Sequence, residues 1–136
     1  MNSYDANTKF KQLRIFKLQR KGEGERYEGF KHLENRRMLF HGSAMTNMLG
    51  ILAQGLRIAP PEAPSSGYMF GKGIYFADTF KKSMSYTQGL ETRLMFLCEV
   101  ALGSMLKLYN SHFVENLPTK YHSVMGCGAN GPQYER

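Results

Sequence analysis

The 136-residue chain is long enough for one domain or part of one, and its 42% hydrophobic content supports a packed core and argues against wholesale disorder. No apolar run approaches the roughly 20 residues that cross a bilayer, and the polar start lacks the apolar stretch of a secretory signal, so we expect a soluble intracellular protein. The net charge of +7 suits a polyanionic partner, but the basic residues are scattered and a solvated basic surface explains them as simply.

Two strands are predicted in the first third of the chain. Residues 13–18 are typical of a strand with one slip in its alternation, and residues 21–25 form a polar turn. Residues 36–40 form a second short strand that runs straight into His41.

A helix is predicted next. Apolar side chains recur there at helical spacing, at Met45, Met48, Leu49 and Leu52. Ser43 is its expected N-cap and Gly55 its expected end. This spacing favours a core role for the methionines over contacts with a cofactor.

A long loop, a strand and a second helix follow. Residues 57–70 contain several prolines, which exclude a helix or a central strand, and long loops of this kind are often functional. Residues 73–77 are typical of a short strand. Asp78 can cap a helix over residues 79–88.

The last part of the chain predicts two more strands. Residues 93–102 are strongly apolar and indicate a buried strand, and residues 105–109 are its expected partner after a turn at Gly103. Beyond residue 121 the chain is rich in glycine. Its G-x-G-x-x-G pattern is not a dinucleotide fingerprint, because no strand-to-helix transition accompanies it and Pro132 follows.

The two cysteines have different surroundings. Cys98 lies in an apolar run, which favours a small buried hydrophobic residue, and Cys127 lies between glycines. An intracellular protein is not expected to join them as a disulfide. No cluster of ligand residues has the spacing of a metal site, so no metal is expected.

Two short patterns indicate a ligand site, and each is ambiguous alone. His41-Gly42-Ser43 ends a strand, where an imidazole can bond a sugar hydroxyl and a glycine lets a ligand approach the backbone. In the run from Gly71 to Asp78 and on to Tyr86, tyrosines on a strand and on a helix could sandwich a flat ring. A structural histidine and an aromatic core explain these residues as well.

These segments together resemble the catalytic domain of the poly(ADP-ribose) polymerases. The resemblance rests on His41-Gly42-Ser43, the proline-bearing loop at residues 56–64 and the run at residues 67–78, in that order and without a gap. It extends to residues 99–103 and 120–124, and so covers almost the whole chain. The loop is most similar to that of the DNA-damage-responsive nuclear members.

The resemblance implies a fold of the α+β class, the ADP-ribosyltransferase fold, with mostly antiparallel split β-sheets and short flanking helices. It implies that NAD is the substrate, that the bond between nicotinamide and ribose is split, and that ADP-ribose passes to a protein or to a growing polymer. The implied partners are NAD, acceptor proteins and the polymer, with DNA acting only through other domains. The implied location is the nucleus.

The resemblance also assigns the nicotinamide contacts. Gly42 would bind the amide of nicotinamide through its backbone, and Ser83 would bind it through its hydroxyl. Tyr86 would stack on the ring, and Tyr75 would close the other side. Stacking together with an amide-binding pair fixes the orientation of such a ring.

The remaining implied residues contact the rest of NAD. They are His41 and Ser43 at the adenosine ribose, Asn47 and Arg57 on the adenine side, Tyr68 in the loop over the donor, and Lys82 in the wall of the site. The predicted catalytic pair is His41 and Tyr75, and the others bind the donor.

The chain departs from the family pattern at its end. In the family a glutamate on a later strand stabilises positive charge on the ribose. The one late candidate here is Glu135, which has no strand to hold it. We therefore expect residues 1–136 to be the NAD-binding part of a catalytic domain, cut short before that glutamate and without a regulatory helical domain or a DNA-binding domain. An incomplete sequence and a degenerate copy both explain this.

Three functions remain in competition. The first is an ADP-ribosyltransferase or a fragment of one. The second is a non-catalytic module that binds NAD or ADP-ribose, and the third is a basic nucleic-acid binder.

Overall fold

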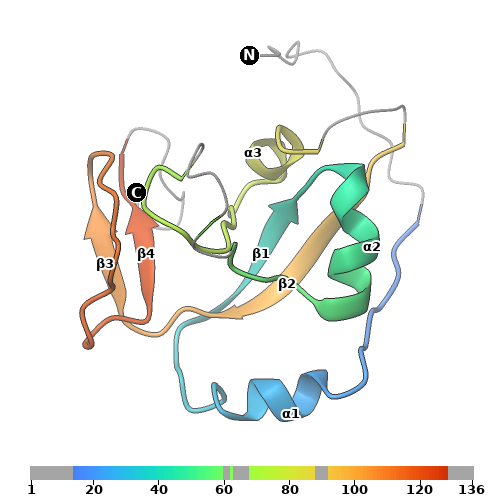
Figure 1. The fold of residues 1–136 in the computed structure, drawn as a ribbon, viewed down its shortest axis with the longest axis horizontal. Helices are drawn as coiled ribbons and strands as arrows, with labels where there is room; N and C mark the ends of the chain where they lie inside the picture. The colour runs from blue at the N-terminus through green and yellow to red at the C-terminus, as the bar shows by residue number, and fades with distance from the viewer. Residues whose placement is uncertain (1–13, 60–61, 63–67, 88–91, 129–136) are drawn as a thin grey trace.

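The computed structural model describes residues 14–59, 62, 68–87 and 92–128, which form helices and two separate two-stranded sheets (Figure 1). In chain order the elements are α1 (Glu23–Glu28), β1 (Arg36–Gly42), α2 (Met45–Gln54), α3 (Phe80–Met84), β2 (Met95–Ala101), β3 (Met105–Leu108) and β4 (Ser123–Gly126). This mixture confirms the α+β class.

The first sheet joins β1 and β2 in antiparallel register. His41 lies opposite Phe96 and Gly42 opposite Met95, so the sheet brings the end of β1 to the start of β2. Both strands were predicted. The strand expected at residues 73–77 is reduced to a bridge between Ala77 and Phe40, whose backbones exchange bonds of 2.8 and 2.9 Å.

The second sheet pairs β3 with β4 in parallel. The prediction that residues 105–109 pair with the preceding strand is wrong, because the chain turns away at Gly103, whose φ is 55°. A parallel partner must come from beyond a long crossover, here residues 109–122. The sequence analysis missed β4, which is short and ends in the glycine-rich segment. The expectation of antiparallel pairing therefore applies to the first sheet alone.

The start of the described chain differs from prediction. Residues 14–18 are not a strand, and Ile15 and Phe16 are 80% and 76% exposed. The predicted polar turn contains the first turn of α1, which begins at Glu23. Arg20 forms an ion pair with Glu23, and acidic residues in a first helical turn are favourable to the helix dipole.

Both predicted helices after β1 exist, but their starts differ. Ala44 rather than Ser43 is the N-cap of α2, and Gly55 ends that helix with a φ of 85°, as expected. The next helix, α3, is shorter than residues 79–88. Its N-cap is Thr79 rather than Asp78, and no side chain caps it.

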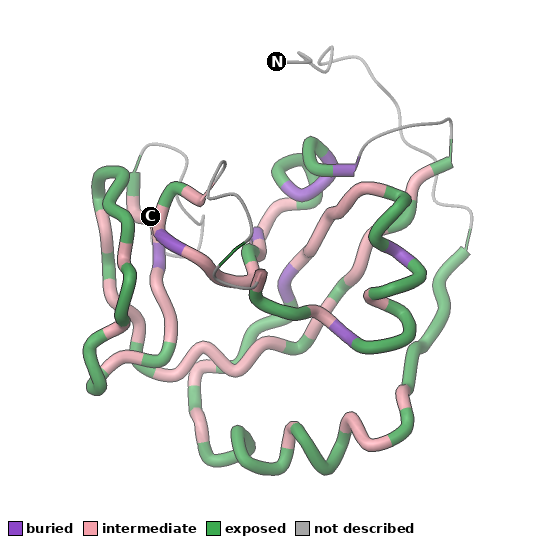
Figure 2. Tube along the Cα trace, viewed as in Figure 1, coloured by how far each residue is buried: buried purple, intermediate pink, exposed green. Residues whose placement is uncertain are grey.

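The hydrophobic core of the described residues is small and dispersed. The buried hydrophobic residues are Leu39, Met48, Ala77, Met84 and Met125. Figure 2 shows the buried residues, in purple, as short pieces spread over both sheets, α2 and α3. Strand β2 is half-buried at best, so the prediction of a buried strand is wrong, and Cys98 is only partly covered.

Candidate functional site

The end of β1 is pressed against the backbone of α3. A Cβ atom added to Gly42 would lie 1.9 Å from the Ser83 carbonyl oxygen and 3.1 Å from Cγ2 of Thr87. Ser83 is buried, and its hydroxyl donates a 2.9 Å hydrogen bond to the carbonyl of Phe40. Two predicted ligand-binding residues, Gly42 and Ser83, are therefore direct neighbours, and only glycine fits at the end of the strand.

His41 links β1 to the segment that leads into the Ala77 bridge. Its Nδ1 lies 2.8 Å from the carbonyl oxygen of Tyr75, and its ring contacts Phe76 with centroids 5.7 Å apart. A carbonyl can only accept a hydrogen bond, so Nδ1 carries the proton and, in the neutral ring, Nε2 is left as an acceptor. The two predicted catalytic residues, His41 and Tyr75, are thus joined directly.

The phenol of Tyr75 is held by the backbone of the preceding turn. Its oxygen accepts a 3.1 Å bond from the Phe70 N–H and donates a 2.7 Å bond to the Gly71 carbonyl. Burial raises the pKa of Tyr75 above its ordinary value of 10.0, and the nearby phenols of Tyr68 and Tyr86 add to the rise, while the Phe70 N–H opposes it. The ring therefore stays neutral at physiological pH.

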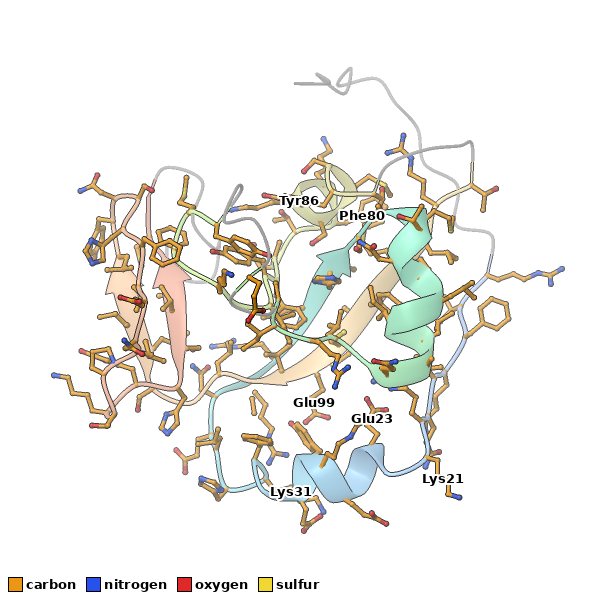
Figure 3. All side chains as sticks on the ribbon, in the orientation of Figure 1. Lys21, Glu23, Lys31, Phe80, Tyr86 and Glu99 are labelled. Atoms are coloured by element: carbon orange, nitrogen blue, oxygen red, sulfur yellow. The ribbon has the colours of Figure 1, made fainter. Side chains whose placement is uncertain are left out.

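Two further predicted tyrosines lie around Tyr75. The rings of Tyr68 and Tyr75 are tilted against each other with centroids 6.2 Å apart. Tyr86 lies two residues beyond the end of α3 and is 60% exposed, and its N–H donates to the Ser83 carbonyl. Figure 3 shows Tyr86 beside α3. Exposed aromatic faces at this position are available to stack on a flat ligand.

The residues predicted on the adenine side lie at the two ends of α2. The Asn47 side chain donates a 3.0 Å bond to Oγ of Ser43, which follows β1 directly. Arg57 lies beyond the other end of the helix and donates a 2.6 Å bond to Gln54. Within the described part of the chain, the Arg57 side chain bonds Gln54, which is not one of the predicted NAD-binding residues.

The last predicted residue, Lys82, is exposed on α3 next to Ser83. Two neighbours of the site were missed by the sequence analysis. Thr87 is buried against Gly42, and Phe76 contacts the ring of His41. Ser83 and Thr87 are four residues apart, a spacing that places two side chains on one face of a helix. Because α3 ends at Met84, this spacing is only a weak signal for Thr87.

Other kinds of site have no support in the described residues. No group of three His, Cys, Asp or Glu side chains there could hold a metal ion. No helix in the described ranges is long and apolar enough to span a membrane. Glu135, the last glycine of the G-x-G-x-x-G pattern and the three prolines of the loop at residues 56–64 lie outside the described residues.

Comparisons with known proteins agree with the resemblance. The family model for the poly(ADP-ribose) polymerase catalytic domain matches residues 2–136. The chain is 52% identical over 134 residues to poly [ADP-ribose] polymerase 1 of Gallus gallus, covering 96% of this chain and 13% of that relative. It is 50% identical over 133 residues to poly [ADP-ribose] polymerase of Drosophila melanogaster, covering 96% and 13%. Poly [ADP-ribose] polymerase 2-B of Oryza sativa subsp. japonica is 52% identical over 124 residues, covering 88% and 20%.

The α+β fold, with a glycine-ended strand set against a short helix, is that of a catalytic-domain segment. The chain belongs to the poly(ADP-ribose) polymerase catalytic domain family, and it spans about 13 to 20% of the length of these relatives.

Proposed function

We propose that the chain binds NAD and forms part of an enzyme that splits the bond between nicotinamide and ribose. The ADP-ribose passes to a protein side chain or to a growing ADP-ribose polymer. The observation that carries the proposal is the direct contact of Gly42 with Ser83, beside the tyrosines Tyr75 and Tyr86. The names of the relatives, all poly(ADP-ribose) polymerases, support the same reaction.

The nicotinamide end of NAD would lie at this contact. The main chain of Gly42 and the hydroxyl of Ser83 bind the carboxamide, and Tyr86 stacks on the ring opposite Tyr75. A planar ring with one amide is oriented fully by stacking and a donor–acceptor pair. The wall of this end is completed by Lys82.

The adenosine end would lie along the start of α2. His41 offers Nε2 as an acceptor, so a ribose hydroxyl donates to it. Ser43 and Asn47 add further polar groups beside the ribose, Arg57 lies on the adenine side, and Tyr68 covers the donor.

Bond cleavage places positive charge on the ribose, and a carboxylate stabilises it. We assign that carboxylate to none of the described residues. The proposal therefore separates donor binding, which the described residues perform, from transfer, which also requires the carboxylate. Acceptor proteins, the polymer and a nuclear location belong to the proposal for the whole enzyme.

The test measures binding and transfer separately on the 136-residue chain. Benzamide, which carries the ring and amide of nicotinamide, is expected to bind and to compete with NAD. Radiolabelled NAD then reports transfer to the chain itself or to added protein. The proposal is contradicted if the chain does not bind benzamide at millimolar concentration.

Two alternatives give different results in the same assays. A non-catalytic module for NAD or ADP-ribose binds benzamide but transfers no label, and this is the second candidate because the carboxylate is assigned to none of the described residues. A nucleic-acid binder instead shows DNA affinity that falls steeply with salt, without competition by benzamide.

A further inference from the structure

The phenol of Tyr75 is held by backbone groups of the turn that precedes it. Its oxygen bonds the backbone of Phe70 and Gly71, at 3.1 and 2.7 Å. Any shift of that two-residue backbone therefore moves the ring face that closes the nicotinamide position. The crossover between β3 and β4 and the end of β4 both contact Phe70 or Gly71.

The crossover between β3 and β4 holds this backbone from one side. The Val114 N–H donates to the Phe70 carbonyl at 3.3 Å, and the Ser111 hydroxyl donates to the Met69 carbonyl at 3.2 Å. Gly71, with a φ of 101°, is buried so tightly that an added Cβ would lie 2.2 Å from the Val114 carbonyl oxygen. Such a close approach of two backbones leaves no freedom in their relative position.

The end of β4 holds the same backbone segment through the ring of Phe70. A Cβ atom on Gly126 would lie 2.8 Å from both Cε2 and Cζ of the Phe70 ring, so this edge of the ring is packed against the bare backbone of the strand. The φ of Gly126 is outside the left-handed region, so a side chain there is excluded by the ring and not by backbone strain. We call Gly126 together with residues 111–114 the supporting surface.

We propose that the supporting surface is a positioning element of the donor site, with Gly126 and Phe70 as positioning residues for the Tyr75 phenol. The inference rests on the proposed function. The second sheet then has a role in the reaction although none of its residues is assigned a contact with the donor. It sets how closely the Tyr75 ring approaches the pyridine of NAD, and so favours a flat ring.

The test uses the 136-residue chain and the matched substitutions Gly126→Ala and Gly128→Ala. Both add one methyl group to the same end of β4, but the Cβ of residue 128 meets only the Tyr109 carbonyl at 3.4 Å, an ordinary contact. Gly126→Ala is expected to weaken benzamide binding about fivefold, the size of one lost aromatic contact. Adenosine, which probes the other end of the site, binds both variants equally.

A second pair of variants covers the case in which Gly126→Ala does not fold. Phe70→Leu removes the ring atoms that lie over Gly126 and is expected to weaken benzamide binding as well. In the double variant the added methyl group occupies the space that the ring left, so benzamide affinity recovers toward the original value. Recovery on combining two deleterious changes is the signature of positioning through their contact.

The outcomes separate this inference from the proposed function. If the unsubstituted chain binds no benzamide, the proposed function fails and this inference fails with it. If it binds benzamide and Gly126→Ala binds as well as Gly128→Ala, the inference alone is overturned. Equal loss of benzamide and adenosine binding in Gly126→Ala also overturns it, because that pattern reports general unfolding.

Discussion

Tyr86 has the most exposed ring of the proposed nicotinamide position, and its role is the simplest to test. Replacing Tyr86 with Ala removes the stacking face and should cost about 1 kcal/mol of benzamide binding, or about fivefold in the dissociation constant. Because the side chain is 60% exposed, the thermal stability should change little. Titration calorimetry with benzamide measures the first effect, and unchanged affinity refutes the assignment of Tyr86.

Tyr75 makes the site sensitive to alkaline pH. Its neutral phenol donates to the Gly71 carbonyl, a bond that a phenolate cannot make, and burial raises its pKa above 10.0. A raised pKa means that the stabilisation is complete below pH 10.0 and is lost as the pH passes the pKa of the folded state. Benzamide affinity should be constant from neutral pH to 10.0 and fall above it.

Tyr75→Phe supplies the control for this pH dependence. The variant lacks the titrating group, so its weaker binding should not change further across the same alkaline range. An identical alkaline fall in both proteins would assign the effect to another group.

Among the elements, the contact between β1 and α3 is the one on which the site depends. Gly42→Ala would place a methyl group 1.9 Å from the Ser83 carbonyl oxygen, so the strand and helix must separate. We expect a loss of about 1 to 3 kcal/mol in stability, the usual cost of overpacking, together with loss of benzamide binding. Denaturant unfolding and calorimetry measure the two effects.

Gly50→Ala is the matched control for that substitution. Gly50 lies inside α2 with open space around its Cβ position, and replacing glycine in a helix by alanine is favourable by up to about 1 kcal/mol. A destabilisation by Gly50→Ala as large as that by Gly42→Ala would show that the close contact is not the cause.

The sequence predicted these elements unequally, for physical reasons. Local patterns located β1, α2 and β2, because apolar periodicity and a terminal glycine are short-range signals. They did not predict the pairing of β3 with β4, since a parallel pair is set by contacts across a long crossover. The strand expected at residues 13–18 is not formed over its described part, residues 14–18, because alternation indicates a possible face but not a partner to cover it.

The site itself was predictable only through the family resemblance. Spacing alone left His41 and the tyrosines open to a structural explanation. The structure adds contacts that no local pattern contains, namely the bond of His41 to the Tyr75 carbonyl and the packing of Phe70 on Gly126. These join residues that are distant in the chain, so periodicity could not have found them.

For the molecule as a whole, the small core predicts weak cooperativity. The buried hydrophobic residues of the described ranges are few, while Leu49 and Ile15 are each 80% exposed. Hydrophobic burial is the main favourable term in folding, so the isolated chain should melt broadly and bind a hydrophobic dye such as ANS. Saturating benzamide should raise the melting temperature, because it binds the folded state alone.

Calorimetry and dye fluorescence test this expectation. A sharp, cooperative transition with no dye binding would contradict it.

The crossover between the parallel strands also limits where the chain can change in length. Its first part carries Ser111 and Val114, whose bonds to Met69 and Phe70 fix the turn before Tyr75, so an inserted residue there would displace both anchors. The part from residue 115 to residue 120 only returns the chain to β4, and a longer return costs little loop entropy. Among homologues, insertions should therefore accumulate after residue 114 and be rare before it.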